Sequence, residues 1–267
     1  MEFHLSGDLS GSIVSKNSIT DSNQRCIVLQ GTDKVTVTDN VAYNTYGHCF
    51  VLQDGIEQGN ILTNNLGAVQ KAIPDSNIIS IAESDMFPAT FWLSNPSNVL
   101  KGNVAAGSEE SGFWFELLDQ VRGPSKKQDQ LSLINPSTMD IGSFEENVAH
   151  SNTGEGFKTY PNGYSPITNR AWITNFKSYR NGGSGSLLRS VSNLGIKGGY
   201  FSDNHKQIDV DEECSDIVIQ DATIHGLTPL YHSQASAQSY KSHCPAWKSI
   251  LGIEMHSHRR CLRASAV

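Results

Sequence analysis

The sequence RCIVLQG, residues 25–31, returns in nearly the same form as HCFVLQDG, residues 48–55. In both stretches a basic residue precedes a cysteine, which is followed by two apolar residues, a leucine and a glutamine. The two cysteines, Cys26 and Cys49, stand 23 positions apart. Two explanations compete: a pair of cysteines that meet in a site, or one structural unit written twice.

The repeat extends well beyond these two stretches. GSIVSKNSITDSNQRCIVL (11–29) aligns with VTVTDNVAYNTYGHCFVL (35–52), and GNVAAGSEESGFWFEL (102–117) aligns with ENVAHSNTGEGFKTY (146–160). Each unit holds three short β-branched or aromatic runs with alternating apolar residues, separated by Asn, Gly, Ser or Asp. A period of about 22 residues suits one coil of a parallel β-helix. We therefore predict an all-β, single-stranded, right-handed parallel β-helix of roughly seven coils, about 34 Å long.

In such a rod, residues one period apart lie directly above each other. The asparagines Asn40, Asn65, Asn103 and Asn147 then form a column, and we expect their side-chain amides to hydrogen-bond from coil to coil. Cys26 and Cys49 are stacked in the same way. They form either a buried stack of small residues or a disulfide, since stacked Cα atoms fall within bridging range.

Two segments interrupt the period: a first insertion, residues 69–89, and a second insertion, residues 118–138. Long loops on one side of a repeat rod commonly form its binding face, although they can also only shield a flank. We assign residues 1–232 to the β-helix and residues 233–267 to an irregular C-terminal cap or tail. In that tail His256, His258, Cys244 and Cys261 invite a zinc site, but their spacing matches no standard finger.

Composition limits the partners of the chain. With 267 residues, a net charge of −7 and a pI near 5.7, the protein lacks the basic footprint that nucleic acid requires. No apolar run approaches the length of a membrane span, and the N-terminus has no signal-peptide pattern, so we expect no direct membrane insertion. We also expect a monomer.

The best cluster of ionisable residues consists of Arg25, His48, Asp54 and Glu57. The repeat places Arg25 beneath His48, and the two carboxylates occupy the following corner. A basic residue beside carboxylates could abstract a proton next to a uronic acid, so we name all four as candidate catalytic residues. Asp54 and Glu57 are also weak candidates for calcium, the cofactor that the sequence suggests for this cluster. The alternative is structural: a turn at Asp54 and an ion pair between Arg25 and Glu57.

Aromatic residues suggest a surface for sugar. Alternation along FWF (113–115) sends Trp114 to the side opposite its two neighbours, and we place Phe50 at the position equivalent to Trp114. If Phe50, Trp92 and Trp114 face outward, sugar rings could stack on them while Glu116 and Arg122 bind hydroxyl groups. The alternative is that each ring packs in the core or under a loop.

Further carboxylates accompany these rings. Glu109, Glu110 and Glu116 precede the second insertion, Asp119 lies at its start, and the acidic run IDVDEECSD spans residues 208–216. A carboxylate pair that flanks a glycosidic bond can hydrolyse it, but we expect most of these groups to be solvated. We place the acidic run on a solvated corner.

Several motifs resemble one family closely: RCIVLQG, NVAYNTYGHCFVLQDGIEQGN, NNLG, ATFWLSNPSNVLKGNVAAGSEESGFWFELL and FEENVAHSNTGEGF. They are similar to the β-helix region of the group that contains the transmembrane hyaluronidase, the cell-migration-inducing hyaluronan-binding protein and fibrocystin-like receptors. The resemblance covers residues from about 10 to about 205. It implies a β-helix, a location outside the cell or at its surface, and calcium-dependent hyaluronan depolymerisation in some members.

Two functions follow as hypotheses. The first is a polysaccharide-directed β-helix that binds or depolymerises a hyaluronan-like glycan and is a fragment of a larger extracellular protein. The second is a non-catalytic structural or interaction module of a fibrocystin-like receptor.

Overall fold

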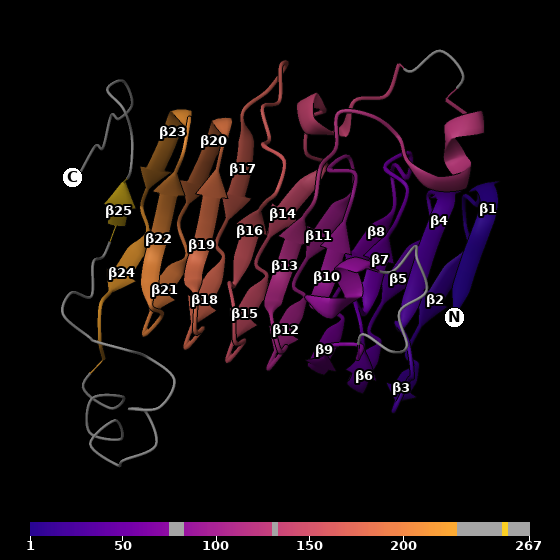
Figure 1. Ribbon diagram of the computed structural model, residues 1–267, viewed down its shortest axis with the longest axis horizontal. Coiled ribbons are helices and arrows are strands. Elements are labelled where there is room, and N and C mark those ends of the chain that lie inside the picture. The colour runs from indigo at the N-terminus through magenta and orange to yellow at the C-terminus, as the bar shows by residue number, and fades with distance from the viewer. Residues whose placement is uncertain (75–82, 130–132, 229–252, 256–267) are drawn as a thin grey trace.

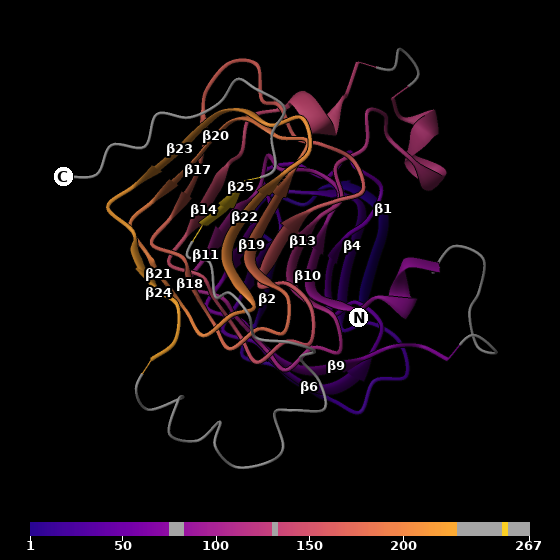
Figure 2. The same ribbon diagram turned by 60° about the vertical axis from the view of Figure 1, so that its left-hand side comes forward.

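The computed structural model describes residues 1–74, 83–129, 133–228 and 253–255, the last three as backbone only. The chain winds into a rod whose walls are three β-sheets, each built of parallel strands (Figures 1 and 2). Successive strands pass from the first sheet to the second and third and then return to the first, one coil later. The predicted right-handed parallel β-helix is confirmed, with about eight coils rather than seven.

The first sheet has nine strands among the described residues: β1 (Glu2–Asp8), β4 (Ile27–Asp33), β7 (Phe50–Leu52), β10 (Ala89–Leu93), β13 (Ser111–Phe115), β16 (Phe157–Thr159), β19 (Ser184–Arg189), β22 (Lys206–Asp211) and β25 (Ile253–Met255). We call it the nine-stranded sheet. Both insertions adjoin it, because the first leads into β10 and the second follows β13.

The other two sheets have eight described strands each. The second sheet contains β2 (Ile13–Ser15), β5 (Thr36–Thr38), β8 (Ile61–Thr63), β11 (Val99–Lys101), β14 (Ser143–Glu145), β17 (Ala171–Thr174), β20 (Ser192–Lys197) and β23 (Ser215–Gln220). The third contains β3 (Ser18–Thr20), β6 (Val41–Tyr46), β9 (Leu66–Lys71), β12 (Val104–Ala106), β15 (Val148–His150), β18 (Lys177–Tyr179), β21 (Tyr200–Ser202) and β24 (Thr223–His225).

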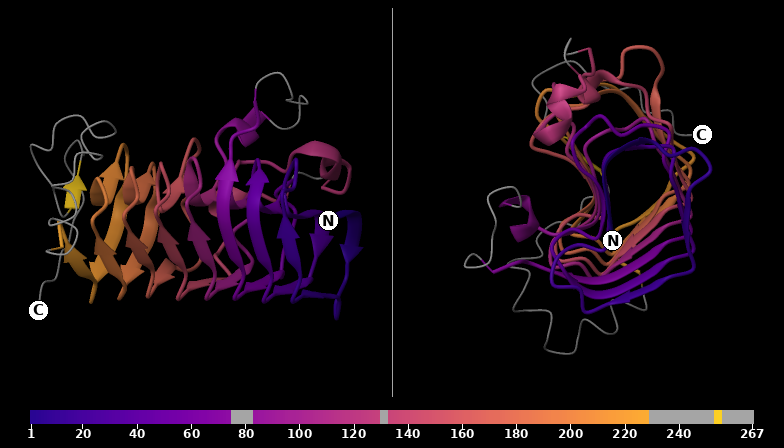
Figure 3. Two further views of the ribbon diagram at one scale, coloured as in Figure 1. Left: turned by 90° about the horizontal axis from the view of Figure 1, so that it is seen from below. Right: turned by 90° about the vertical axis from the view of Figure 1, so that its right-hand side faces the viewer.

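The described parts of the insertions hold three short 3-10 helices. The first insertion contains η2 (Glu83–Met86), and the second contains η3 (Gly123–Lys127) and η4 (Pro136–Thr138). Both insertions project from the side of the rod that the nine-stranded sheet forms, as the end-on view in Figure 3 shows.

The interior is filled by aromatic rings stacked along the rod. Phe50 pairs in register with Phe91, which pairs with Phe113, and consecutive ring centroids lie 4.7 Å apart. The prediction that Phe50 is equivalent to Trp114 is therefore wrong: Trp114 pairs with Trp92, which pairs with Val51. Strand alternation sends Phe50 inward, where 1% of its surface is exposed, so it cannot stack with a sugar.

The predicted asparagine column is confirmed. The side-chain oxygens of Asn65, Asn103 and Asn147 each accept bonds from the backbone N–H and the side-chain amide of the asparagine one coil earlier, at 2.9–3.1 Å. The residue before each asparagine has a positive φ, as Asn64 does at 54°. This left-handed residue turns the chain from the second sheet into the third, and the buried amide then satisfies the backbone groups that the corner leaves open.

Cys26 and Cys49 form a disulfide, which selects one of the two predicted alternatives. Their Cα atoms lie 4.5 Å apart on adjacent coils. The predicted tail, residues 233–267, lies outside the described residues except for β25, which pairs with β22. The four zinc candidates also lie outside them, so both predictions stay open.

Candidate functional site

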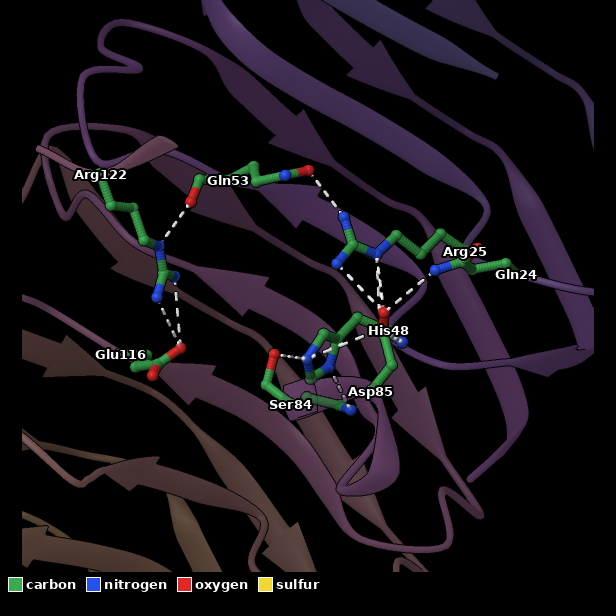
Figure 4. A network of polar contacts seen from close by, with 9 residues as sticks. Gln24, Arg25, His48, Gln53, Ser84, Asp85, Glu116 and Arg122 are labelled. Atoms are coloured by element: carbon green, nitrogen blue, oxygen red, sulfur yellow. Dashed lines mark hydrogen bonds and ion pairs between the residues drawn. The ribbon is translucent and has the colours of Figure 1, made fainter. Parts of the chain in front are cut away.

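Six of the candidate residues gather on the outer face of the nine-stranded sheet, between the two insertions: Arg25, His48, Trp92, Trp114, Glu116 and Arg122. Figure 4 shows the centre of this face, where a chain of polar contacts joins Arg25, His48 and Asp85 to Gln53, Arg122 and Glu116. The strands supply Trp92 and Trp114, and the insertions supply Asp85 and Arg122. We call this surface the outer-face site.

Asp85 of η2 docks the first insertion on the β-helix. Its carboxylate is fully buried and accepts the backbone N–H of His48 at 2.7 Å. It also accepts the guanidinium of Arg25 through Nε and Nη2, each at 3.1 Å. The repeat did place Arg25 next to His48 as predicted, but the ion-pair alternative is corrected, because the partner of Arg25 is Asp85 and not Glu57.

The ring of His48 is held in one neutral tautomer. Its Nδ1 accepts the backbone N–H of Ala89 at 3.0 Å, so the proton sits on Nε2, which donates to Ser84 Oγ at 3.1 Å. The ring also stacks on Trp92 with 4.7 Å between centroids. Burial lowers the pKa of His48 to about 3, with Arg25 adding to the shift and Asp85 opposing it.

This depressed pKa predicts a pH effect on stability. Since the folded pKa lies below the unfolded value, the unfolded chain binds the proton first, and the stabilisation is lost as pH falls below about 6.5. Between pH 7 and pH 4 we expect the wild type to lose about 3 kcal/mol more than His48→Gln, measured by urea unfolding. The carboxyl groups titrate in both proteins, so their contributions cancel in the difference between the two losses of stability. Equal losses in the two proteins would contradict a neutral buried His48.

The two other candidate catalytic residues, Asp54 and Glu57, are buried and bonded within the fold. Glu57 accepts the backbone N–H groups of Gly31, Asp54 and Gly55 at 2.8–2.9 Å, which holds the turn after β7. Asp54 accepts the N–H and the hydroxyl of Ser125 in η3 at 3.1 and 2.7 Å. Asp54 thus anchors the second insertion, as Asp85 anchors the first.

These contacts bear on the calcium prediction. Calcium takes about six to eight oxygen ligands, but the oxygens of Asp54 and Glu57 already accept hydrogen bonds from the protein. Within residues 1–74, 83–129 and 133–228, no group of three His, Cys, Asp or Glu side chains is arranged to hold a metal ion. The two carboxylates therefore do not fit a calcium site.

Arg122 lies across the outer-face site. Its Nε donates to the carbonyl of Gln53 at 2.9 Å, and its Nη1 and Nη2 lie 3.3 Å from Glu116. Its Cζ lies 4.5 Å from the centre of the Trp92 ring, an arrangement that favours a cation–π contact. About a quarter of the Arg122 side chain stays exposed, whereas Trp92 is covered.

A second group centres on Lys158 of β16, which lies one coil beyond Trp114. The ammonium nitrogen of Lys158 lies 4.2 Å from the centre of the Trp114 ring. It also lies 3.1 Å from Glu110 and 3.8 Å from Glu155. Burial raises the pKa of Glu155, and Glu110 adds to that shift while Lys158 opposes it.

Three polar atoms on this face are buried without a hydrogen-bond partner among the described residues: Trp92 Nε1, Ser111 Oγ and Asp209 Oδ1. Buried polar atoms normally have partners, so each marks a position where water or a ligand group would be favourable. Asp209 also corrects a prediction, because it lies in β22 with 6% of its surface exposed and not on a solvated corner.

Three residues of this site were not predicted from the sequence: Asp85, Glu155 and Lys158. Lys158 could have been predicted, because EGFKT aligns with SGFWF and places the lysine beside Trp114. Of the other carboxylates, Glu109 accepts the backbone N–H of Ala72, and Asp119 is exposed. Across the described ranges, no helix is long and apolar enough to cross a membrane.

The fold and this site define the chain as a parallel β-helix repeat protein with two insertions docked beside a charged and aromatic outer face. The sequence model named CEMIP beta-helix matches residues 1–157. The chain therefore belongs to the CEMIP β-helix family, as the motif resemblance implied.

Two relatives place that family in context. The chain is 34% identical over 182 residues to the human cell surface hyaluronidase CEMIP2, and the match covers 58% of this chain and 13% of that protein. It is 36% identical over 153 residues to mouse fibrocystin-L, which covers 57% of this chain and 3% of that protein. The chain therefore spans only a small part of the length of these relatives.

Among solved structures, the A-module of mannuronan C-5 epimerase AlgE4 from Azotobacter vinelandii is similar, with a TM-score of 0.40 and 15% sequence identity. The match covers 85% of this chain and 62% of that one.

Proposed function

We propose that this chain is an extracellular polysaccharide-binding β-helix that binds a uronic-acid glycan of the hyaluronan type at the outer-face site. The observation that supports it is the meeting of Trp114, Arg122 and Lys158 with three partly exposed glutamates on one sheet face between the two insertions. The cations would pair with the carboxylates of the glycan, and the glutamates would accept hydrogen bonds from its hydroxyl groups.

The geometry supports different roles for the candidate residues. Arg122 and Glu116 are partly exposed and can contact a ligand directly, as can Glu110 and Glu155 beside Lys158. Trp92 and Trp114 keep little open surface, so they hold the cations in place and offer an edge to a sugar. Arg25, His48, Asp54 and Glu57 stay a prediction as catalytic residues, and their contacts support a positioning role.

The extracellular location rests on two lines of support. The disulfide between Cys26 and Cys49 is of a kind that persists in oxidising compartments. One relative is named a cell surface hyaluronidase and another a hyaluronan-binding protein. The net charge of −7 disfavours a polyanion overall, so binding would depend on the local cations of the outer-face site and weaken at high salt.

Arg122→Ala tests this proposal. We expect it to weaken the binding of hyaluronan oligosaccharides about tenfold, measured by calorimetry at low salt, because a charge-assisted bond to a carboxylate is lost. Lys177→Ala, which removes one charge from the exposed face of β18 in the third sheet, is the matched control and should bind as the wild type does.

Size-exclusion chromatography of long hyaluronan in the same samples follows depolymerisation. A carboxyl group with a raised pKa beside a second carboxylate suits acid–base cleavage, so shortening of the polymer that Glu155→Gln abolishes would extend the proposal to catalysis. Failure of the wild type to bind any uronic-acid glycan would contradict the proposal. It would favour the structural or interaction module instead.

A further inference from the structure

The second sheet carries a cleft on its outer face, away from the outer-face site. The cleft has a volume of about 460 Å³ and extends from the start of β14 across β17 to the end of β20. Its lining includes Ser143, Glu145, Arg170, Trp172, Thr174 and Lys197. An aromatic ring, two cations and hydroxyl groups thus share one open depression.

Trp172 lies flat on the sheet because its neighbour in register is a glycine. Trp172 of β17 pairs with Gly195 of β20. A Cβ atom at Gly195 would come within 2.3 Å of Trp172 Cζ3 and 2.5 Å of Cε3, so the glycine makes room for the indole ring. The ring is half-buried, with part of its surface open to solvent. A half-exposed aromatic surface of this kind can pack against the apolar face of a sugar ring.

Charge surrounds the ring on two sides. Arg170 lies with its Cζ 5.9 Å from the centre of the Trp172 ring, and two bonds of 2.9 Å from Nη2 to the carboxylate of Asp216 hold it there. Lys197 is exposed at the other end, and the ion pairs of the described residues do not include it. One cation is therefore fixed, and the other is available to an anionic group.

We infer that this cleft is a second binding site for an acidic saccharide, with one sugar ring stacked on Trp172 and its carboxylate paired with Lys197. Ser143 and Thr174 supply hydroxyl groups next to the ring, and Glu145 supplies an acceptor. The inference shares the ligand class of the proposed function and rests on it in that respect, but the two sites have no residue in common.

Fluorine NMR of the full chain labelled with 5-fluorotryptophan tests the inference. The chain has four tryptophans, and Trp172→Phe identifies the Trp172 signal. Addition of a short hyaluronan oligosaccharide is expected to shift that signal, and a neutral oligosaccharide of the same length should bind about tenfold more weakly because Lys197 has no carboxylate to pair with.

Three variants make the test specific. Lys197→Glu changes an exposed side chain, so the fold should persist. The charge reversal should lower the affinity for the hyaluronan oligosaccharide, measured by titration of the Trp172 signal, by at least tenfold. Trp172→Phe keeps an aromatic ring and should retain most of the oligosaccharide binding measured by calorimetry in the Arg122→Ala background, whereas Trp172→Ala should remove it.

The outcomes separate the two proposals. A shifted Trp172 signal together with normal binding by Arg122→Ala would support the cleft and contradict the outer-face site. No shift of the Trp172 signal, or equal titration of the wild type and Lys197→Glu, would overturn the second site whatever happens at the first.

Discussion

Replacement of Asp85 by alanine is expected to lower the free energy of unfolding by about 3–5 kcal/mol. The substitution removes the acceptor of the His48 backbone N–H and the partner of the Arg25 guanidinium, whose side chain is only 11% exposed. Both donors stay buried after the change: the His48 N–H loses its acceptor, and Arg25 keeps its bond to Gln53 but loses the carboxylate that neutralises it. Urea unfolding at pH 7 measures the loss.

Asp85→Asn separates the charge from the shape. The amide oxygen can still accept the His48 N–H, but it no longer neutralises Arg25, so we expect about half the loss seen for alanine. Hydrogen exchange at the His48 amide should accelerate in the alanine variant, because that group loses its acceptor.

Asp119→Ala is the control for these variants, since it removes an exposed carboxylate from the second insertion. It should change stability by no more than about 0.5 kcal/mol. A loss below 1 kcal/mol for Asp85→Ala would mean that η2 is not held on the β-helix by this carboxylate.

Asp85 also marks the limit of what the sequence could predict. The coil and the asparagine column follow from a period that the printed sequence repeats, because residues one period apart must stack. An insertion has no counterpart in the other coils, so its residues have no position that the period can assign. The approach of Asp85 to Arg25 depends on the path of the loop, which no repeat encodes.

The misplacement of Phe50 has a related cause. The first insertion separates β7 from β10, so the offset that relates Phe50 to later coils differs from the regular period. A shift of one residue in register exchanges the inward and outward faces of a strand, and it turned a core phenylalanine into a predicted ligand contact. The second insertion likewise separates Trp114 from Lys158, but each residue follows the column asparagine of its own coil, Asn103 or Asn147, at the same spacing. The position of Lys158 beside Trp114 could therefore have been predicted from the aligned motif.

Replacement of Asn103 by alanine is the second change with a large expected effect, a loss of about 4 kcal/mol in the free energy of unfolding. The side chain is fully buried, donates to Leu62 O at 2.8 Å and accepts the backbone N–H of Asn65 at 3.0 Å. Both backbone groups lose these bonds in the variant, and an unmet buried group costs about 1–3 kcal/mol. Asn23→Ala, at an exposed position, should stay within about 0.5 kcal/mol of the wild type.

Asn103→Asp decides whether the column acts through hydrogen bonds or through packing, because aspartate has nearly the same shape as asparagine. One carboxylate oxygen can still accept from Asn65, but the other replaces a donor and faces the oxygens of Leu62 and Asn147. A loss at pH 7 at least as large as that of alanine is therefore expected in urea unfolding, since a buried charge is added to the broken bonds. Near-wild-type stability of Asn103→Asp would show instead that shape alone fills the corner, and that the coils do not depend on the amide chain to stay in register.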